Sequence, residues 1–176
     1  DFKDRNTCVL FGDGAGCVVL RAEEGDGTSA DRGVLDTLIY SDGNYAPDLC
    51  ATGGPSTNHD VGYITMNGRE VFRHAAVNMA EVSVEILEKN GVGLDDVDWL
   101  VPHQANIRIL EATAKRLNIP MEKVISTVGL HANTSAASIP LALAHGVQEG
   151  QIKAGQLLLL PGMGAGFTWG ASLIRF

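Results

Sequence analysis

Two polar side chains, His103 and Asn133, stand where apolar stretches of the sequence stop and a helix is expected to begin. A glycine-rich segment, residues 161–167, follows a third apolar stretch. In α/β enzymes the groups that follow the carboxyl ends of strands meet at one edge of the sheet. An imidazole, a carboxamide and backbone N–H groups are hydrogen-bond donors, so the pattern predicts a site that stabilises negative charge on an oxygen atom.

This set of donors suits the formation of a carbon–carbon bond between two thioesters. His103 and Asn133 can direct two donors at one oxygen and stabilise an enolate, while the N–H groups of residues 164–166 can polarise a second carbonyl. Hydrolysis fits less well, because it would require a general base placed to activate water. The part that this pattern lacks is a nucleophile to carry the acyl group.

Each feature alone also has a simpler explanation. A histidine after a proline commonly makes a hydrogen bond at a strand end, an asparagine before Thr-Ser commonly caps a helix, and three glycines can form a hairpin turn. A nucleotide-binding loop is rejected for residues 161–167, because they lead into a strand and offer no helix N-terminus to a phosphate. The chemical interpretation depends on the three features together.

Composition indicates one α/β domain, since the 176 residues are 45% hydrophobic and include 21 glycines. No apolar run approaches the roughly 18 residues of a membrane span. The net charge of −8 argues against nucleic acid or an anionic membrane as the main partner. Three cysteines without paired spacing indicate neither a disulfide framework nor a zinc site, and no signal-peptide pattern is present, so we expect a cytoplasmic protein. The start at Asp1 suggests a chain cut from something longer.

The first 32 residues are expected to form a terminal hairpin and a linker. Strand patterns at residues 7–11 and 17–20 flank the glycine-rich residues 12–16, and residues 23–32 are charged and small. A second unit is expected over residues 33–176. It begins with a strand at residues 34–40, an irregular excursion to residue 60 and a short strand at residues 62–66.

Helical spacing of apolar residues is clearest between Asn67 and Gly91, where Asn67 and Glu70 have the pattern of a capping box. A second amphipathic helix is expected to bury Ile107, Leu110, Ala114 and Leu117, with Arg108, Glu111 and Lys115 spaced for ion pairing on its other side. The remaining expected elements are strands at residues 98–102, 124–127, 156–160 and 167–176 and a helix at residues 135–149 with Pro140 in its early turns.

A weak internal repeat relates residues 10–16 to residues 160–166, since each combines an apolar end with three glycines at alternate positions before a strand. The repeat suggests two related halves, with most of the first half absent from this chain.

Several motifs together resemble β-ketoacyl-acyl-carrier-protein synthase III, the initiating condensing enzyme of bacterial fatty-acid synthesis. They are Pro-His-Gln-Ala-Asn at residues 102–106, His-Ala-Asn-Thr-Ser-Ala-Ala-Ser at residues 131–138 and Gly-Phe-Thr-Trp-Gly at residues 166–170. The resemblance implies a thiolase-like fold, an αβαβα layered sandwich of two halves, found as a homodimer. This chain would supply the C-terminal half and the last hairpin of the N-terminal half.

The resemblance also implies a mechanism. In that family a cysteine takes acetyl from acetyl-CoA, and malonyl-acyl-carrier-protein then loses CO2 to give an enolate that attacks the acyl-cysteine. His103 and Asn133 match the residues that assist decarboxylation and hold the enolate oxygen. The backbone N–H of Ala165 matches an oxyanion donor, although the family more often has glycine there. No metal or organic cofactor is implied, since the coenzyme A thioester is a substrate.

Binding residues are implied in the same way. Gly68, Phe72 and Asn106 would line the pantetheine channel, and Arg5 would lie near the nucleotide of coenzyme A. Arg73 and Arg108 match a basic patch that receives the acidic acyl carrier protein, although a solvated helix face explains Arg73 equally well. Met163 stands where the family often carries phenylalanine, and His131 is expected to be structural.

The nucleophilic cysteine of the family lies upstream of the first glycine-rich motif, and Cys8, Cys17 and Cys50 match no part of its motif. We therefore expect this chain to be inactive without an N-terminal half that carries the cysteine. Two alternatives remain open: a related condensing enzyme of secondary metabolism with a different acyl group, and a non-catalytic partner subunit.

Overall fold

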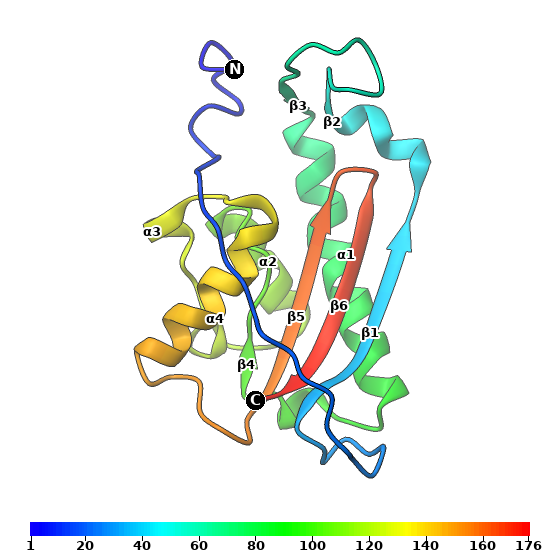
Figure 1. Ribbon diagram of the computed structural model, residues 1–176, viewed down its shortest axis with the longest axis vertical. Coiled ribbons are helices and arrows are strands. Elements are labelled where there is room, and N and C mark those ends of the chain that lie inside the picture. Colours follow the sequence, from blue (N-terminus) through cyan, green and yellow to red (C-terminus); the bar gives the residue numbers. More distant parts are fainter.

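The computed structural model describes all residues from Asp1 to Phe176. Its core is a four-stranded mixed sheet in the order β1-β6-β5-β4, in which only β4 and β5 run parallel (Figure 1). Strands β2 and β3 form a separate small antiparallel pair. The strands are β1 (Gly33–Ser41), β2 (Leu49–Ala51), β3 (Ile64–Met66), β4 (Trp99–Leu100), β5 (Leu157–Gly164) and β6 (Thr168–Arg175). The helices are α1 (Gly68–Lys89), α2 (Ile107–Arg116), α3 (Val128–His131) and α4 (Ser138–Gln148), with short 3-10 turns η1 (Gly43–Asp48), η2 (Leu94–Asp96), η3 (Met121–Lys123) and η4 (Ser135–Ala137).

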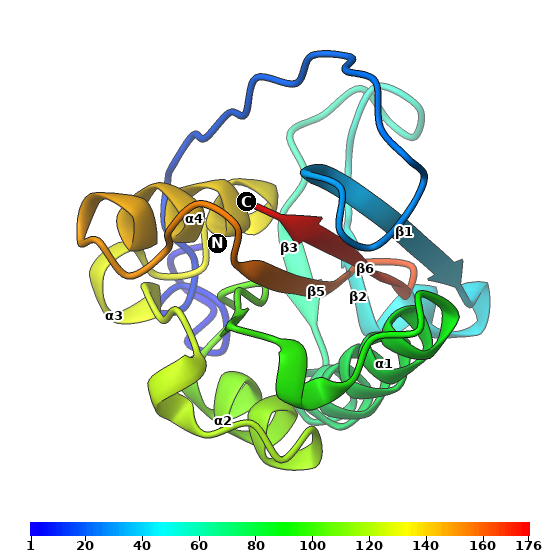
Figure 2. The same ribbon diagram turned by 90° about the horizontal axis from the view of Figure 1, so that it is seen from below.

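Helices cover both faces of the sheet, with α1 and α2 on one side and α4 on the other (Figure 2). The side chains of β5 show why its sequence is wholly apolar. Leu157 and Leu159 belong to the core beneath α1 and α2, whereas Leu158 and Leu160 belong to the core beneath α4. A strand that is buried on both faces has no position left for a polar residue. The apolar strand expected before the glycine-rich segment is confirmed and extends to Gly164.

The long helix α1 is confirmed, and Gly91 ends it with a φ of 64°. The capping box expected at its start is not formed. The amide of Asn67 instead donates to Asp48 at 2.9 Å, and the Glu70 carboxylate accepts from Arg73, so neither side chain is free to cap the helix. Each residue has a charged or polar partner that competes successfully with the helix N-terminus.

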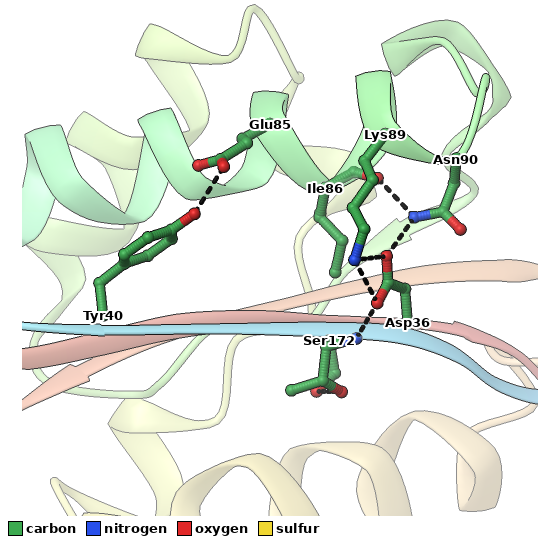
Figure 3. Close-up of polar contacts among 8 residues, drawn as sticks. Asp36, Tyr40, Glu85, Ile86, Lys89, Asn90 and Ser172 are labelled. Atoms are coloured by element: carbon green, nitrogen blue, oxygen red, sulfur yellow. Dashed lines mark hydrogen bonds and ion pairs between the residues drawn. The ribbon is translucent and has the colours of Figure 1, made fainter.

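Polar contacts also fasten the edge strand β1 to α1 (Figure 3). The Asp36 carboxylate accepts hydrogen bonds from Lys89 and Asn90 at the end of α1, and these partners lower the pKa of Asp36. Tyr40 donates to Glu85, about one turn before Lys89 in α1, at 2.5 Å. Strand β1 is therefore held along its length by the helix as well as by β6.

The hairpin expected within residues 1–32 is absent. Residues 7–10 form turns, and Phe11 makes a single parallel bridge to Asn133. Residues 12–27 form an extended strap that runs on the same side of the sheet as α4 (Figures 1 and 2). No neighbouring strand accepts hydrogen bonds from residues 17–20, and Val19 is 94% exposed. A strand pattern without a partner strand does not become a strand, because its N–H and C=O groups remain with the solvent.

The three alternate glycines of the strap lie against the segment that leads into α4 and against the first turn of α4 itself. A Cβ atom on Gly12 would come within 2.6 Å of the His131 carbonyl oxygen, and one on Gly16 within 2.6 Å of Pro140. Side chains of an extended segment alternate between two faces, so glycine at every second position makes one face flat enough for close contact. The repeat of small residues therefore marks a contact surface, where sequence analysis placed a turn.

Three further expectations differ in detail from the structure. Ile107 is 44% exposed, and Ile109 takes the buried position of α2 instead. Arg108, Glu111 and Lys115 form no ion pairs with one another, in keeping with the small free energy of exposed pairs on a helix. The strand expected at residues 124–127 is reduced to one bridge between Leu100 and Val124. No helix in the structure is long and apolar enough to cross a membrane.

Candidate active site

A pocket of about 1000 Å³ opens beside the carboxyl end of β5 and the start of α1, and 18 of its 29 lining residues are hydrophobic. It contains most of the residues that the sequence singled out. These are Gly68, Phe72, His103, Asn106, Arg108, Asn133 and Ala165. The apolar walls come from α1, from the β2–β3 pair and from Met163, so the pocket suits a long, largely apolar ligand with polar groups near His103 and Asn133.

His103 is positioned by β5. The extended segment after β4 continues its ladder along β5, since the N–H of Val101 donates to Leu159 and the N–H of His103 donates to Pro161 at 2.9 Å. The Nδ1 atom of His103 lies 2.7 Å from the hydroxyl of Ser138, the first residue of α4. Burial lowers the pKa of His103 to about 4, so the imidazole is neutral near pH 7. Its Nε2 atom has no partner in the chain, and the ring lines the pocket.

Asn133 is held by its backbone. Its N–H donates to the Leu10 carbonyl and its carbonyl accepts from the Gly12 N–H, both at 2.9 Å. The side-chain oxygen Oδ1 accepts from the N–H of Ser135, also at 2.9 Å, which fixes the orientation of the amide. The Nδ2 group has no acceptor in the chain, so it is free to donate to a ligand in the pocket.

The backbone around Asn133 is strained. Ala132 has φ 59° and ψ −161°, a combination that is otherwise almost restricted to glycine, and Ser135 has φ 54°. Non-glycine residues in such conformations persist only where neighbouring contacts enforce them. Here the enforcing contacts are the two hydrogen bonds that Asn133 makes with Leu10 and with Gly12 of the strap.

Ala165 lies in the turn between β5 and β6, exposed at the rim of the pocket. Its N–H makes no hydrogen bond within the chain, and its φ lies outside the left-handed region. Alanine is therefore unstrained here and still offers its N–H to a ligand. Its neighbour Met163 lies in a small core with Phe167, which stacks on Tyr45 at a ring distance of 5.2 Å.

The positive charge at the pocket differs from the sequence expectation. Arg73 does not line the pocket, because its guanidinium is bound to Glu70 in its own helix, which raises the pKa of Arg73. Arg108 and Arg69 do line it, and both are exposed and make no ion pair. Arg5 does not line this pocket and lies instead in a separate surface hollow formed by residues 2–9, so its expected place near the nucleotide of coenzyme A stays a prediction.

Three residues that shape the site were not expected from the sequence patterns: Arg69, Gln104 and Ser138. Arg69 directly follows Gly68, and Ser138 ends the Asn-Thr-Ser-Ala-Ala-Ser motif, so position in the motifs was an available signal. The side chain of Gln104 is fully buried and makes four hydrogen bonds, to the carbonyls of Pro102 and Ile125 and from the N–H groups of Thr127 and Val128. A polar residue inside an apolar stretch next to His103 was the signal for it.

None of the three cysteines is joined to the two donors by a hydrogen bond. Cys50 lines the pocket from β2, and its thiol lies 3.2 Å from the Thr65 hydroxyl. Cys8 lies in the small hollow with Arg5, and Cys17 is exposed on the strap. No group of three or more His, Cys, Asp or Glu side chains is arranged to hold a metal ion.

Comparison with known proteins gives consistent matches. Residues 87–176 match the family described as 3-oxoacyl-[acyl-carrier-protein (ACP)] synthase III C terminal, and residues 1–43 match 3-oxoacyl-[ACP] synthase III. The chain is 59% identical to the beta-ketoacyl-[acyl-carrier-protein] synthase III of Paramagnetospirillum magneticum over 99% of its own length and 54% of that protein.

Solved structures agree in fold. The 3-oxoacyl-[acyl-carrier-protein] synthase III of Aquifex aeolicus superposes with a TM-score of 0.86 and 45% identity, covering all of this chain and 53% of that one. The Pseudomonas aeruginosa enzyme of the same name gives a TM-score of 0.90 and 41% identity, with the same coverage. The chain thus spans about half the length of the relatives that it matches, and the thiolase-like α/β fold expected from its motifs is confirmed.

Proposed function

Because this chain belongs to the 3-oxoacyl-[acyl-carrier-protein] synthase III family, we propose that it forms the enolate-stabilising part of a condensing acyltransferase. The reaction is the decarboxylative condensation of acetyl-CoA with malonyl-acyl-carrier-protein to acetoacetyl-acyl-carrier-protein, which initiates fatty-acid synthesis. The observation that carries this proposal is a pair of side-chain nitrogen atoms in one pocket that have no partner in the chain, Nε2 of a neutral His103 and Nδ2 of Asn133.

The two donors suit the decarboxylation step. Loss of CO2 from a malonyl thioester leaves negative charge on the thioester oxygen, and fixed donors stabilise that charge without reorganising. A neutral imidazole donates a hydrogen bond without introducing a full charge. The N–H of Ala165 would bind the second carbonyl oxygen, that of the acyl group under attack.

The remaining pocket suits the arm and the carrier of the substrate. Gly68, Phe72 and Asn106 would line the path of the pantetheine group, since all three are on the pocket wall. Arg69 and Arg108 are exposed guanidinium groups without ion partners, and they would attract an acidic carrier protein despite the overall charge of −8. Carrier binding through these residues should weaken with rising salt.

The nucleophile is assigned to a part of the enzyme outside these 176 residues. The relatives are about twice as long, and no cysteine of this chain is bonded to His103 or Asn133. We therefore propose that condensation needs a second, cysteine-bearing half, and that the complete enzyme acts as a homodimer without metal or organic cofactor.

Intact-mass spectrometry tests this assignment. The purified chain, with and without a polypeptide bearing the cysteine, is incubated with acetyl-CoA and malonyl-acyl-carrier-protein. We expect the added polypeptide alone to gain an acetyl group and acetoacetyl-acyl-carrier-protein to form only in the mixture. Condensation by the 176-residue chain alone would contradict the proposal.

Substitution then tests the role of the donors. His103→Ala and Asn133→Ala should each reduce product formation in the mixture by about 100-fold or more. His59→Asn, which changes an exposed histidine in the β2–β3 loop at a φ of 62° that asparagine tolerates, should have no effect. Full activity of His103→Ala would instead favour the non-catalytic partner subunit. A competition between acetyl-CoA and other acyl-CoA donors tests the second alternative. A longer or branched product in place of the acetoacetyl product would favour a condensing enzyme of secondary metabolism.

A further inference from the structure

Ser138 is the one side chain hydrogen bonded to the imidazole of His103. Its hydroxyl oxygen lies 2.7 Å from Nδ1, and the residue is 2% exposed. The same oxygen accepts the backbone N–H of Gln104 at 3.2 Å. The hydroxyl therefore connects the first turn of α4 to two consecutive residues beyond β4.

Counting protons on this hydroxyl distinguishes the two neutral forms of His103. A serine hydroxyl has one proton and two lone pairs, and the Gln104 N–H already takes one lone pair. If Nδ1 carried the imidazole proton, it would occupy the second lone pair, and the buried hydroxyl proton would have no acceptor. If Nδ1 is unprotonated, the hydroxyl donates to it and every polar atom of the cluster is satisfied, as buried polar groups normally are.

We propose that Ser138 is a positioning residue that donates its hydroxyl proton to Nδ1 of His103 and thereby keeps the pocket-facing Nε2 of the neutral imidazole protonated. The ring then presents an N–H to the ligand. The opposite tautomer would present a lone pair, which repels an oxyanion. Because the partner is a hydroxyl and no carboxylate faces the ring, the tautomer is selected without stabilising the imidazolium form, in agreement with the lowered pKa of His103.

The catalytic part of this inference rests on the proposed function, since a protonated Nε2 matters there as the donor to the enolate oxygen. The tautomer itself does not, and it can be measured without any substrate. The two ring nitrogens of a histidine differ in their 15N chemical shifts according to which carries the proton. Two-bond 1H–15N correlation of the 15N-labelled chain at pH 7 therefore reads the tautomer directly.

The chain has five histidines, so the signals of His103 are assigned by their loss in His103→Asn. We expect the wild-type spectrum to show Nε2 protonated and Nδ1 unprotonated. A wild-type spectrum with Nδ1 protonated would overturn the inference without the use of any Ser138 variant.

Variants then test whether Ser138 causes this preference. Ser138→Ala should give a mixture of tautomers or the Nδ1–H form, and Ser138→Thr, which keeps the hydroxyl, should retain the Nε2–H form. Ser83→Ala is the matched control, because it removes an equally buried hydroxyl that bonds to the Met79 carbonyl in α1, away from His103. An unchanged tautomer in a folded Ser138→Ala variant would also overturn the inference.

Activity in the reconstituted mixture separates the two proposals. Ser138→Ala should slow malonyl decarboxylation by about 10- to 100-fold. Ser138→Thr, which retains the hydroxyl, and the control Ser83→Ala should both have the wild-type rate. If the wild-type chain shows the Nε2–H tautomer but the mixture never decarboxylates malonyl-acyl-carrier-protein, the proposed function fails and the tautomer assignment stands.

Discussion

His103 and Asn133 line the same pocket, yet the chain holds them in different ways. His103 extends a regular ladder along β5, and its ring and its neighbour Gln104 are fixed by buried side-chain hydrogen bonds. Asn133 lies in an irregular segment with strained residues on both sides, and its backbone is fixed by hydrogen bonds to Leu10 and to Gly12 of the strap. The position of His103 therefore depends on buried polar groups that are all hydrogen bonded. The position of Asn133 depends on close contact between two segments that are far apart in the sequence.

Breaking the contact of the strap should have the largest effect. In Gly12→Ala the new Cβ would lie 2.6 Å from the His131 carbonyl oxygen, a backbone atom that cannot turn away. The strap must then move, and with it the Gly12 N–H that donates to the Asn133 carbonyl, next to the bond between Asn133 and Leu10. A displacement of about 1 Å at a reacting centre costs about 100-fold in rate, so we expect at least that loss of decarboxylation in the reconstituted mixture.

The matched control for this prediction is Gly129→Ala in α3, where a Cβ meets nothing within 4 Å. Its rate should remain within about twofold of wild type, because the substitution neither clashes nor requires a left-handed backbone. Equal losses in the two variants would show that the strap has no particular role in holding Asn133.

Gln104 links the two segments that position His103 and Asn133. Its side chain joins the segment at His103 to residues 125–128, which lead toward Asn133. Gln104→Ala leaves two buried N–H groups without acceptors, and each such group costs about 1–3 kcal/mol. We expect the free energy of unfolding in urea to fall by about 2–4 kcal/mol. Gln148→Ala, at the exposed end of α4, should change it by less than about 0.5 kcal/mol, and equal effects would refute the argument.

Features of the site that depend on interactions between residues close in the sequence could be predicted, whereas features that depend on contacts between distant residues could not. Strand β5 and helix α1 follow from local periodicity, and the sequence predicts them correctly. The motifs also identify His103 and Asn133, which line one pocket, while their catalytic role stays a prediction. The hairpin expected at residues 7–20 was wrong because alternate glycines are compatible with both a hairpin turn and a flat contact face. Only the three-dimensional position of the segment around the start of α4 distinguishes these two structures, and that position is not encoded locally. The ion pair between Arg73 and Glu70 was not expected, because Glu70 had been assigned to a helix cap.

The burial of His103 should make the free energy of unfolding depend on pH. Burial lowers the pKa of His103 to about 4 in the folded chain, against an ordinary value of 6.5. The unfolded chain therefore binds this proton first as the pH falls, and stability is lost between pH about 6.5 and about 4. Between pH 7 and pH 5 the loss from this residue is about 2 kcal/mol.

His103→Asn should remove that part of the pH dependence, whereas His59→Asn should leave it unchanged. Urea unfolding at pH 5 and pH 7 provides the measurement for all three proteins. Cationic partners lower the pKa values of the Asp36 and Glu70 carboxylates. Their contribution to stability is lost mainly at lower pH, and it is the same in wild type and variant, so it does not affect this comparison. The same slope in wild type and His103→Asn would mean that the imidazole is not desolvated.

The smallest effect concerns the strain beside Asn133. Ala132→Gly relieves an unfavourable backbone conformation, worth about 1–3 kcal/mol, but adds the larger backbone entropy of glycine in the unfolded chain. We expect a net gain in unfolding free energy of about 1 kcal/mol. The control Ala144→Gly, in the exposed face of α4, should have the opposite sign, with a loss of about 1 kcal/mol.

The rate of Ala132→Gly then separates two sources of order at Asn133. If the bonds from Leu10 and Gly12 hold this residue, the more stable variant keeps the wild-type decarboxylation rate within about twofold, because both bonds remain. If the restricted backbone of alanine holds the amide in place, glycine loosens it and the rate falls although stability rises. The first outcome is expected, since a hydrogen bond on each side of Asn133 fixes its backbone independently of the residue before it.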